Sequence, residues 1–378
     1  MLQILFLIST IYIIFYIVLI LCESLNIKSL FLSKSTTFFV LFSLSLAVVG
    51  CSINPTTDAY DLYRHYLYID SIRNMNYSFC DFMFNPQNPF GGYSKSSLYG
   101  FKLLVYIVSK LNNNRFLPFF SIFIVYSIWG YITINWLNLQ KKSTFLFPSF
   151  LLCSSLMPYI YVNTGIRNSL AASIVALALY QDFIERKKIL YVLSVLIFAC
   201  TIHHAVSLAI PCWILAHYRF NFKMIFIIFA LIISVNPIML LFHEYSSGIL
   251  YTISSSYLIY IGKDAYFYSY TYLILDTFFL VTIFSILLFA RKHNIENIDC
   301  MYNFILIYLA ILMGQVGNYD LVLRPMYIIA MFSGIIICYL VNFTKKLEYR
   351  VAIYIMSIVF FFAAFLVYIP NYITISYF

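Results

Sequence analysis

Charged residues are scarce in this chain of 378 residues. Only 10% are Asp, Glu, Lys or Arg, whereas 63% are hydrophobic, and the mean hydropathy is +0.90. No soluble core could bury this much apolar surface. Many apolar runs approach the roughly 20 residues that a helix needs to span a bilayer. The composition therefore predicts an all-α polytopic membrane protein and excludes a soluble globular enzyme.

Several chemical signatures are also missing. The eight cysteines are scattered, mostly in apolar runs, with no C-x-x-C spacing, so they read as small hydrophobic residues and not as disulfide partners or zinc ligands. The chain has no H-E-x-x-H, G-x-S-x-G, Walker or G-x-G-x-x-G motif. ATP-driven and serine-hydrolase functions are therefore unsupported, and we expect neither a metal site nor a cofactor.

The apolar runs predict about 11–12 membrane helices in a single integral membrane domain over residues 1–378. Two of them form a short-armed hairpin near 189–216. Residues 98–111 are too short to span and carry Lys102 and Lys110, so we expect an interfacial helix there. The expected spans are 2–21, 36–53, 116–137, 145–162, 166–183, 189–202, 205–216, 224–242, 272–290, 302–316, 325–341 and 351–369.

The distribution of Lys and Arg predicts the orientation of these helices. Fourteen of the 23 cations and six of the 14 acids fall on one side, a balance of +8, and the other side keeps nine cations and eight acids, a balance of +1. By the positive-inside rule the first side is cytoplasmic. We therefore expect the long loops 54–115 and 243–271 to lie outside the cytoplasm. The net charge is a topology signal and indicates no nucleic-acid partner.

The densest polar and aromatic stretch is Asp58–Tyr66, within the first outer loop. If it is helical from a cap at Thr57 or Asp58, carboxylates, cations and flat rings come together on adjoining faces. Two other readings stay open: a capped helix on the bilayer surface, and a weak D-x-x-D metal signal. The candidates here are Asp58 and Asp61 as bases, and Tyr60, Tyr63 and Arg64 as ligand-binding residues.

Arg167 follows Gly165 at the outer start of a helix rich in Ala and Ser, and Asn168 comes next. An ionisable group at membrane depth costs about 2.5–3.5 kcal/mol even on a lenient scale, so it should face protein or water. Beside free helix amides, Arg167 suits a phosphate, although it could also anchor the helix at the interface. Arg324 precedes Pro325 at another expected helix start, near Tyr319, and repeats the arrangement.

His203 and His204 lie at the apex of the expected short-armed hairpin. Irregular backbone at membrane depth persists only where it is buried in protein or lines a cavity. Only one of two adjacent histidines can readily face a given ligand, so we expect the other to bond the backbone. A polar pair without a catalytic role is the alternative.

Taken together, these motifs resemble the EpsG family of Wzy-like polymerases of bacterial exopolysaccharide, capsule and O-antigen. The family pattern G-I-R-Q is matched by Gly165-Ile-Arg167-Asn168, with Asn in place of Gln, and H-x-S-A is approximated by His203-His204-Ala-Val-Ser207. The Asp/Tyr-rich stretch Asp58–Tyr66 precedes both, as in the family.

The resemblance implies a membrane glycosyltransferase of GT-C-like architecture. Such an enzyme moves a growing glycan from undecaprenyl diphosphate to the non-reducing end of a lipid-linked repeat unit, on the outer face of the bacterial inner membrane. Arg167 and Arg324 would receive the diphosphate without metal, and Asp58, Asp61 or a histidine at 203–204 would be the base. A flippase and a chain-length regulator are the expected partners, besides the bilayer.

Two other classes compete with a polymerase. A flippase or transporter of the same lipid-linked oligosaccharide would also need arginines and aromatic rings, but we find no internal repeat of the kind such transporters show. A membrane O-acyltransferase or ligase would also use a histidine, yet its acyl donor normally comes from the cytoplasm, where only short basic loops are expected. The polymerase is the favoured reading.

Overall fold

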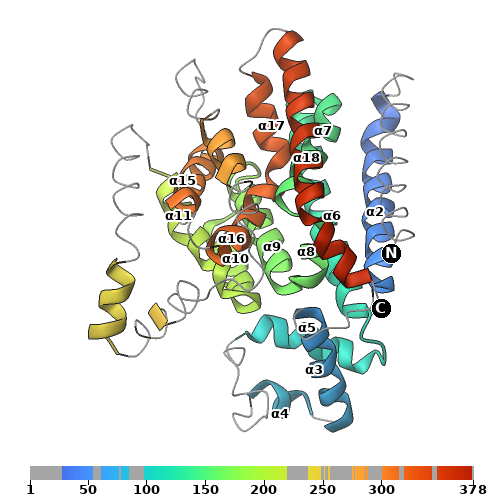
Figure 1. Cartoon of the computed structure of the whole chain (residues 1–378), viewed down its shortest axis with the longest axis vertical. Helices are drawn as coiled ribbons and strands as arrows, with labels where there is room; N and C mark the ends of the chain where they lie inside the picture. The colour runs from blue at the N-terminus through green and yellow to red at the C-terminus, as the bar shows by residue number, and fades with distance from the viewer. Residues whose placement is uncertain are drawn as a thin grey trace. The chain divides into compact units, whose positions relative to one another are not determined.

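The computed structural model of the chain is entirely helical over the part that it describes, and no strand occurs there (Figure 1). The prediction of an all-α polytopic membrane protein is confirmed. The described residues are 28–53, 61–75, 78–84, 98–218, 237–247, 251, 254–255, 275, 277–285, 287, 300–314, 319–342 and 347–376.

The chain divides into two compact units. Unit 1 comprises Met1–Ser207 and Ala330–Phe378, and unit 2 comprises Leu208–Ile329. Most of the candidate site residues that the structure describes belong to unit 1, among them Asp61, Arg167 and His204.

Helix α6 (Phe116–Leu139) is the centre of unit 1. It packs against α2 (Lys28–Ser52), α9 (Ile166–Phe183) and α17 (Ser333–Asn342). The indole nitrogen of the buried Trp129 in α6 donates a hydrogen bond to the Ser333 hydroxyl at 2.9 Å, which satisfies a polar group that would otherwise be orphaned in the core. The helix therefore holds the bundle around it by both apolar and polar contacts.

The small residues of α9 account for its close packing. Ala171, Ala172, Ala176 and Ala178 are fully buried, and α9 contacts both α6 and α10 (Ile189–Ile202). Small side chains let helix backbones approach closely, which is a common solution for helix pairs in membranes. The expected span 166–183 coincides with α9, and the expected arm 189–202 coincides with α10.

The described part of the predicted outer loop 54–115 forms the helices α3 (Asp61–Met75), α4 (Phe79–Phe84) and α5 (Tyr99–Lys110). In Figure 1 they lie together, and contacts join α5 to both α3 and α4. Helix α5 matches the helix expected over 98–111 within one residue at each end. We call α3, α4 and α5 the loop helices.

One expected span is interrupted. Residues 145–162 form a short turn η1 (Ser143–Phe145), α7 (Leu146–Leu156) and α8 (Tyr159–Thr164), so the prediction of one uninterrupted helix was wrong. The break falls at Met157 and Pro158. Proline lacks an amide hydrogen and disfavours helical dihedrals in the residue before it, and Met157 has φ −137° and ψ 74°.

Helix α18 (Leu347–Ser376) of unit 1 packs on α7. The turn η2 (His204–Leu208) follows α10 after His203, and its last residue is the first of unit 2. In unit 2, α11 (Ala209–Ala216) packs on α15 (Cys300–Gly314), and the side-chain amide of Asn303 donates to the Ala216 carbonyl at 3.5 Å. Helix α16 (Tyr319–Met331) starts before Pro325, so the expected start of a helix at Pro325 was wrong.

Two described helical segments, Phe116–Leu139 and Arg350–Val367, are long and apolar enough to cross a membrane. The bent pair Arg324–Met331 and Ser333–Val341 makes a third if it counts as one span. Five shorter apolar helices of 10–17 residues accompany them. The expected spans 2–21 and most of 224–242 lie outside the described residues.

Candidate functional site

Arg167 is the second residue of α9 and follows a tight junction with α8. The amide of Gly165 donates to the Tyr161 carbonyl at 2.8 Å, and a Cβ placed on Gly165 would lie only 2.9 Å from that oxygen. Glycine is therefore needed for the two helices to join so closely. The junction places the Arg167 side chain where only 13% of it is exposed.

The partner of Arg167 is Asp61, in the first turn of α3. An Nη2–H of Arg167 donates to Oδ2 of Asp61 at 3.1 Å, across 106 residues of sequence. The other carboxylate oxygen of Asp61 lies 3.9 Å from Nη1 of Arg64. One carboxylate thus lies between two guanidinium groups, and the cluster of three side chains keeps one net positive charge.

An aromatic surface supports the arginine. The guanidinium carbon of Arg167 lies 5.6 Å from the centre of the Phe101 ring in α5, within the range of a cation–π interaction. The ring of His65, which is only 1% exposed, lies 4.7 Å from the same ring. Phe101 therefore orients the guanidinium plane from one side, while His65 packs against Phe101.

Most donors of Arg167 are uncommitted. A guanidinium carries five N–H groups, and Asp61 takes one of them. The Nε of Arg167 is buried and has no hydrogen-bond partner in the part of the chain that the structure describes. A largely buried cation with donors in a fixed planar fork is suited to a multiply charged anion such as a phosphate.

The two histidines differ in what they contact. The amide of Ala205 donates to Nδ1 of His203 at 3.1 Å, and His203 is 9% exposed. His203 therefore bonds the backbone, and His204 also has a hydrogen bond with the backbone of Cys200, so the expectation that only one of the pair does so was wrong. His204 is exposed. Partial burial lowers the pKa of His204, and the positive charge of Arg167 lowers that pKa further, so His204 lies within electrostatic range of the arginine.

The other predicted site residues are distributed as follows. In α3, Tyr63 is half-buried and Arg64 is exposed, and Asn168 in α9 is 6% exposed. Asp58 and Tyr60 lie outside the described residues. The backbone of Tyr319 belongs to α16, but its side chain is not described, and Arg324 lies partly exposed within α16 in unit 2.

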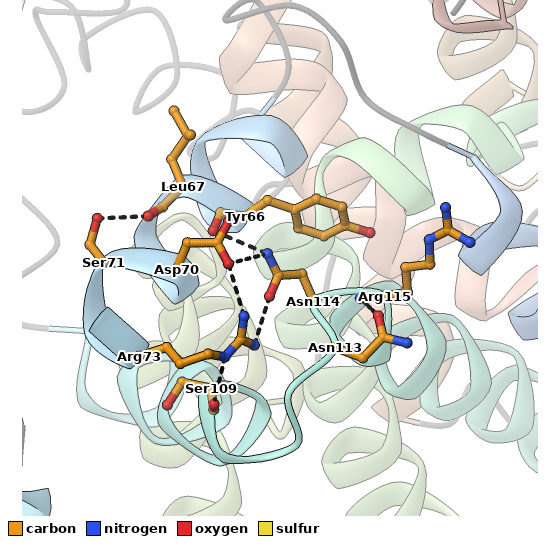
Figure 2. Close-up of polar contacts among 9 residues, drawn as sticks. All are labelled: Tyr66, Leu67, Asp70, Ser71, Arg73, Ser109, Asn113, Asn114 and Arg115. Carbon is orange, nitrogen blue, oxygen red and sulfur yellow. Dashed lines mark hydrogen bonds and ion pairs between the residues drawn. The ribbon is translucent and has the colours of Figure 1, made fainter. Parts of the chain in front are cut away.

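A polar network fixes α3 with respect to the turn before α6, as Figure 2 shows. The Arg73 side chain donates to Asp70 at 2.9 Å, to the Asn114 side chain at 2.9 Å and to the Ser109 carbonyl at 3.2 Å. Asn114 in turn donates to Asp70 at 2.9 Å and to the Tyr66 carbonyl at 3.4 Å. This network positions the helix that carries Asp61.

A buried lysine joins the other two loop helices. Nζ of Lys102 donates to the Met83 carbonyl at the end of α4 at 2.9 Å, and it lies 5.3 Å from the ring centre of Phe82. Burial lowers the pKa of Lys102. Sequence reasoning missed Phe101 and Lys102 as parts of the site, because nothing in the local pattern of an amphipathic helix marks the face that meets a distant arginine.

The arrangement brings together a carboxylate, a histidine and a buried guanidinium. The described residues include no group of three His, Cys, Asp or Glu side chains that could hold a metal ion. The site can bind an anion through Arg167 and can accept a proton at Asp61 or His204, which are the elements of a displacement with an anionic leaving group.

Comparison with known proteins identifies the class. The chain belongs to the EpsG family, whose model matches residues 35–378, and a polysaccharide-polymerase role in general follows from that membership. No curated protein and no solved structure matches the chain.

Proposed function

We propose that this protein is a Wzy-type glycosyltransferase that transfers a growing glycan from undecaprenyl diphosphate to the non-reducing end of a lipid-linked repeat unit. The observation that carries the proposal is the largely buried guanidinium of Arg167, which pairs with Asp61 and lies within electrostatic range of His204. The family membership limits the reaction to a polysaccharide-polymerase type and leaves the chemistry to the site.

The leaving group explains the need for arginine. When the bond between the anomeric carbon and the diphosphate breaks, negative charge develops on the phosphate oxygens. A preorganised cation in a partly dry site stabilises that charge more than bulk water would. Arg167 supplies this cation without a metal ion, and the sequence predicts Arg324 as a second phosphate-binding arginine.

The acceptor hydroxyl needs a base. Asp61 and His204 both lie beside Arg167, so either is close to the diphosphate that the arginine would hold. The lowered pKa of His204 keeps its imidazole neutral and able to accept a proton. Tyr63 and Arg64, on the more exposed face of α3, would contact the sugar rings.

The proposed orientation follows the charge distribution of the loops. The positive-inside rule places the loop helices on the outer face of the bacterial inner membrane. The substrate must then arrive from the cytoplasmic side, which requires a separate flippase, and a chain-length regulator would act on the polymer. The polymer would be a capsule, an O-antigen or an exopolysaccharide.

Deletion of the gene followed by gel analysis of the surface glycan tests the proposal. We expect the ladder of polymer lengths to collapse to single repeat units, which the wild-type gene restores and the Arg167→Ala variant does not. Arg350→Lys, an exposed position at the start of the Arg350–Val367 span, serves as the matched control and should restore the ladder.

The same gel distinguishes the competing function. A lipid-linked oligosaccharide flippase would, when deleted, remove single repeat units from the cell surface together with the polymer. Loss of every surface glycan would therefore contradict the polymerase and favour transport.

A further inference from the structure

Asp61 holds the face of Arg167 to which a phosphate would bind. Its Oδ2 accepts the single hydrogen bond that the guanidinium makes within the described residues, at 3.1 Å. A carboxylate and a phosphate both bind the Nη donors of a guanidinium, and Asp61 already occupies one of them. The ion pair is therefore an internal competitor of any anion that binds at Arg167.

The competitor is held loosely enough to leave. Asp61 is 34% exposed, whereas Arg167 is 13% exposed, so the arginine is fixed by its surroundings and the carboxylate reaches toward solvent. Water can therefore solvate the Asp61 carboxylate when it leaves the arginine. Arg64, whose Nη1 lies 3.9 Å from Oδ1 of Asp61, can still pair with the carboxylate after it leaves Arg167.

The arginine itself would stay in place when the carboxylate leaves. Its guanidinium rests against the Phe101 ring, and α9 begins at the constrained Gly165 junction. The exchange therefore involves a rotation of the Asp61 side chain at the start of α3, while the polar network at the other end of α3 is undisturbed.

We infer that Asp61 occupies the anion site of Arg167 until the donor binds, and that the diphosphate of the donor replaces it and frees the carboxylate to act as base. The inference rests on the proposed function. On transfer, the acceptor oxygen bonds to the anomeric carbon and its proton moves to Asp61. The bond from that carbon to the diphosphate breaks, and the diphosphate leaves with the electron pair, held by Arg167.

The exchange would make donor binding precede removal of the acceptor proton. While Asp61 is paired with Arg167 its carboxylate is engaged and cannot take the acceptor proton. Binding of the donor occupies Arg167 and releases Asp61, so an acceptor that binds alone meets an engaged carboxylate. A site built this way avoids transfer to water or to an acceptor before the donor is in position.

Binding of undecaprenyl diphosphate to the full-length protein in nanodiscs tests the exchange. Asp61→Asn keeps the shape of the side chain but removes the competing charge, so we expect affinity to rise roughly three- to ten-fold. Asp81→Asn on α4 removes the same charge at an exposed position and should leave affinity unchanged. Inorganic diphosphate, as a second probe, separates recognition of the headgroup from that of the lipid.

A second variant makes the result specific. In an Arg167→Ala background the Asp61→Asn change should no longer alter affinity, because the two residues act on one ligand. Unchanged or weaker binding by Asp61→Asn in the native background would overturn the exchange. Glycan transfer should be lost in Asp61→Asn although the diphosphate binds more tightly. Retained transfer would overturn the role of Asp61 as the base.

The binding assay does not depend on polymer formation. If the glycan ladder proved unaffected by deletion of the gene, the proposed function would fail, yet tighter diphosphate binding by Asp61→Asn would still support the exchange. If deletion of the gene did collapse the ladder but Asp61→Asn bound the diphosphate no better, the proposed function would stand and the exchange would be wrong.

Discussion

Arg73 donates a hydrogen bond to the side-chain oxygen of Asn114 at 2.9 Å, across 41 residues of sequence. The bond joins the last turn of α3 to the turn that precedes α6. Because the same guanidinium also reaches Asp70 and the Ser109 carbonyl, three separate acceptors converge on one side chain. The catalytic candidate at the start of α3 thus depends on a network at its other end.

Replacement of Arg73 tests that dependence. A lysine ammonium cannot reproduce the planar fork, so Arg73→Lys should lower stability nearly as much as Arg73→Ala. The network is partly exposed, with Asp70 at 48% and Arg73 at 28%, so we expect a loss of about 1–2 kcal/mol. Thermal unfolding of the detergent-purified protein measures it. Lys110→Ala, an exposed cation on α5, is the control and should have little effect.

Local signals explain the features that sequence reasoning predicted. The start of α9 was readable because Gly165 and the following small residues are local markers, and α5 was readable from its length and its two lysines. The Asp61–Arg167 pair was not, because 106 residues separate the partners and no local pattern specifies which distant side chains meet. Pro158 is a local signal for a helix break, but the continuous apolar run around it led us to predict one unbroken helix.

Gly100 is expected to tolerate no side chain. A Cβ there would lie 2.5 Å from the Thr201 hydroxyl oxygen and 2.9 Å from Cγ1 of Ile202, both at the end of α10. Gly100→Ala should push α5 away from α10 and move the adjacent Phe101, at a cost of about 1–3 kcal/mol. A thermal-unfolding scan with polymer assay checks both effects. The exposed Leu103→Ala on the same helix should be mild, and equal losses from the two changes would contradict the packing argument.

The protonation of His204 should depend on Arg167. Partial burial first, and the arginine charge second, lower the pKa of His204, so the neutral form persists to a lower pH than for an ordinary histidine. Replacing Arg167 by Gln removes one of these causes, so the pKa of His204 should rise. Diethyl pyrocarbonate reacts with neutral imidazole, and its reaction with His204 at different pH values can be followed by peptide mass spectrometry.

The expected direction of the pKa change in His204 is specific to the loss of the Arg167 charge. In the wild-type protein the modification of His204 should decline only well on the acid side of neutrality, and in Arg167→Gln the decline should begin at higher pH. Arg350→Gln should leave the profile as in the wild type. A shift toward lower pH in Arg167→Gln would show that the arginine charge does not act on His204 as the structure indicates.

The two histidines should also differ on substitution. His204→Ala should reduce polymer strongly while the protein remains in the membrane, because His204 is the exposed histidine and lies within electrostatic range of Arg167. His203→Ala removes the acceptor that holds the Ala205 amide, so it should lower the amount of folded protein instead. Immunoblots of membranes beside glycan gels separate the two effects. Equal loss of protein from both changes would support a packing role for the pair.

Reporter fusions test the predicted topology. Fusions after Lys188, Lys223 and Lys292 should report the cytoplasm, and fusions after Tyr77 and Lys263 should report the outside, because the cation balance is +8 on the first side and +1 on the second. A cytoplasmic signal at Tyr77 would reverse the placement of the loop helices and with it the proposed outer active site.

The final prediction concerns Arg167 and Arg324 as a pair that binds one diphosphate. A guanidinium makes two parallel bonds to phosphate oxygens and an ammonium does not, so Arg-to-Lys should cost nearly as much as Arg-to-Ala at either position. Each charge-assisted contact is worth about 1.5–3 kcal/mol, or roughly ten- to a hundred-fold in rate if it forms as the leaving charge develops.

The double change distinguishes one site from two. If both arginines serve the same ligand, Arg167→Lys combined with Arg324→Lys should cost less than the product of the single effects, because the residues act as a unit. Polymer made in vitro from lipid-linked repeat units measures all three variants, with Arg350→Lys as the control. Near-normal polymer from Arg324→Lys alone would assign that arginine to the membrane interface and leave Arg167 as the sole cation at the leaving group.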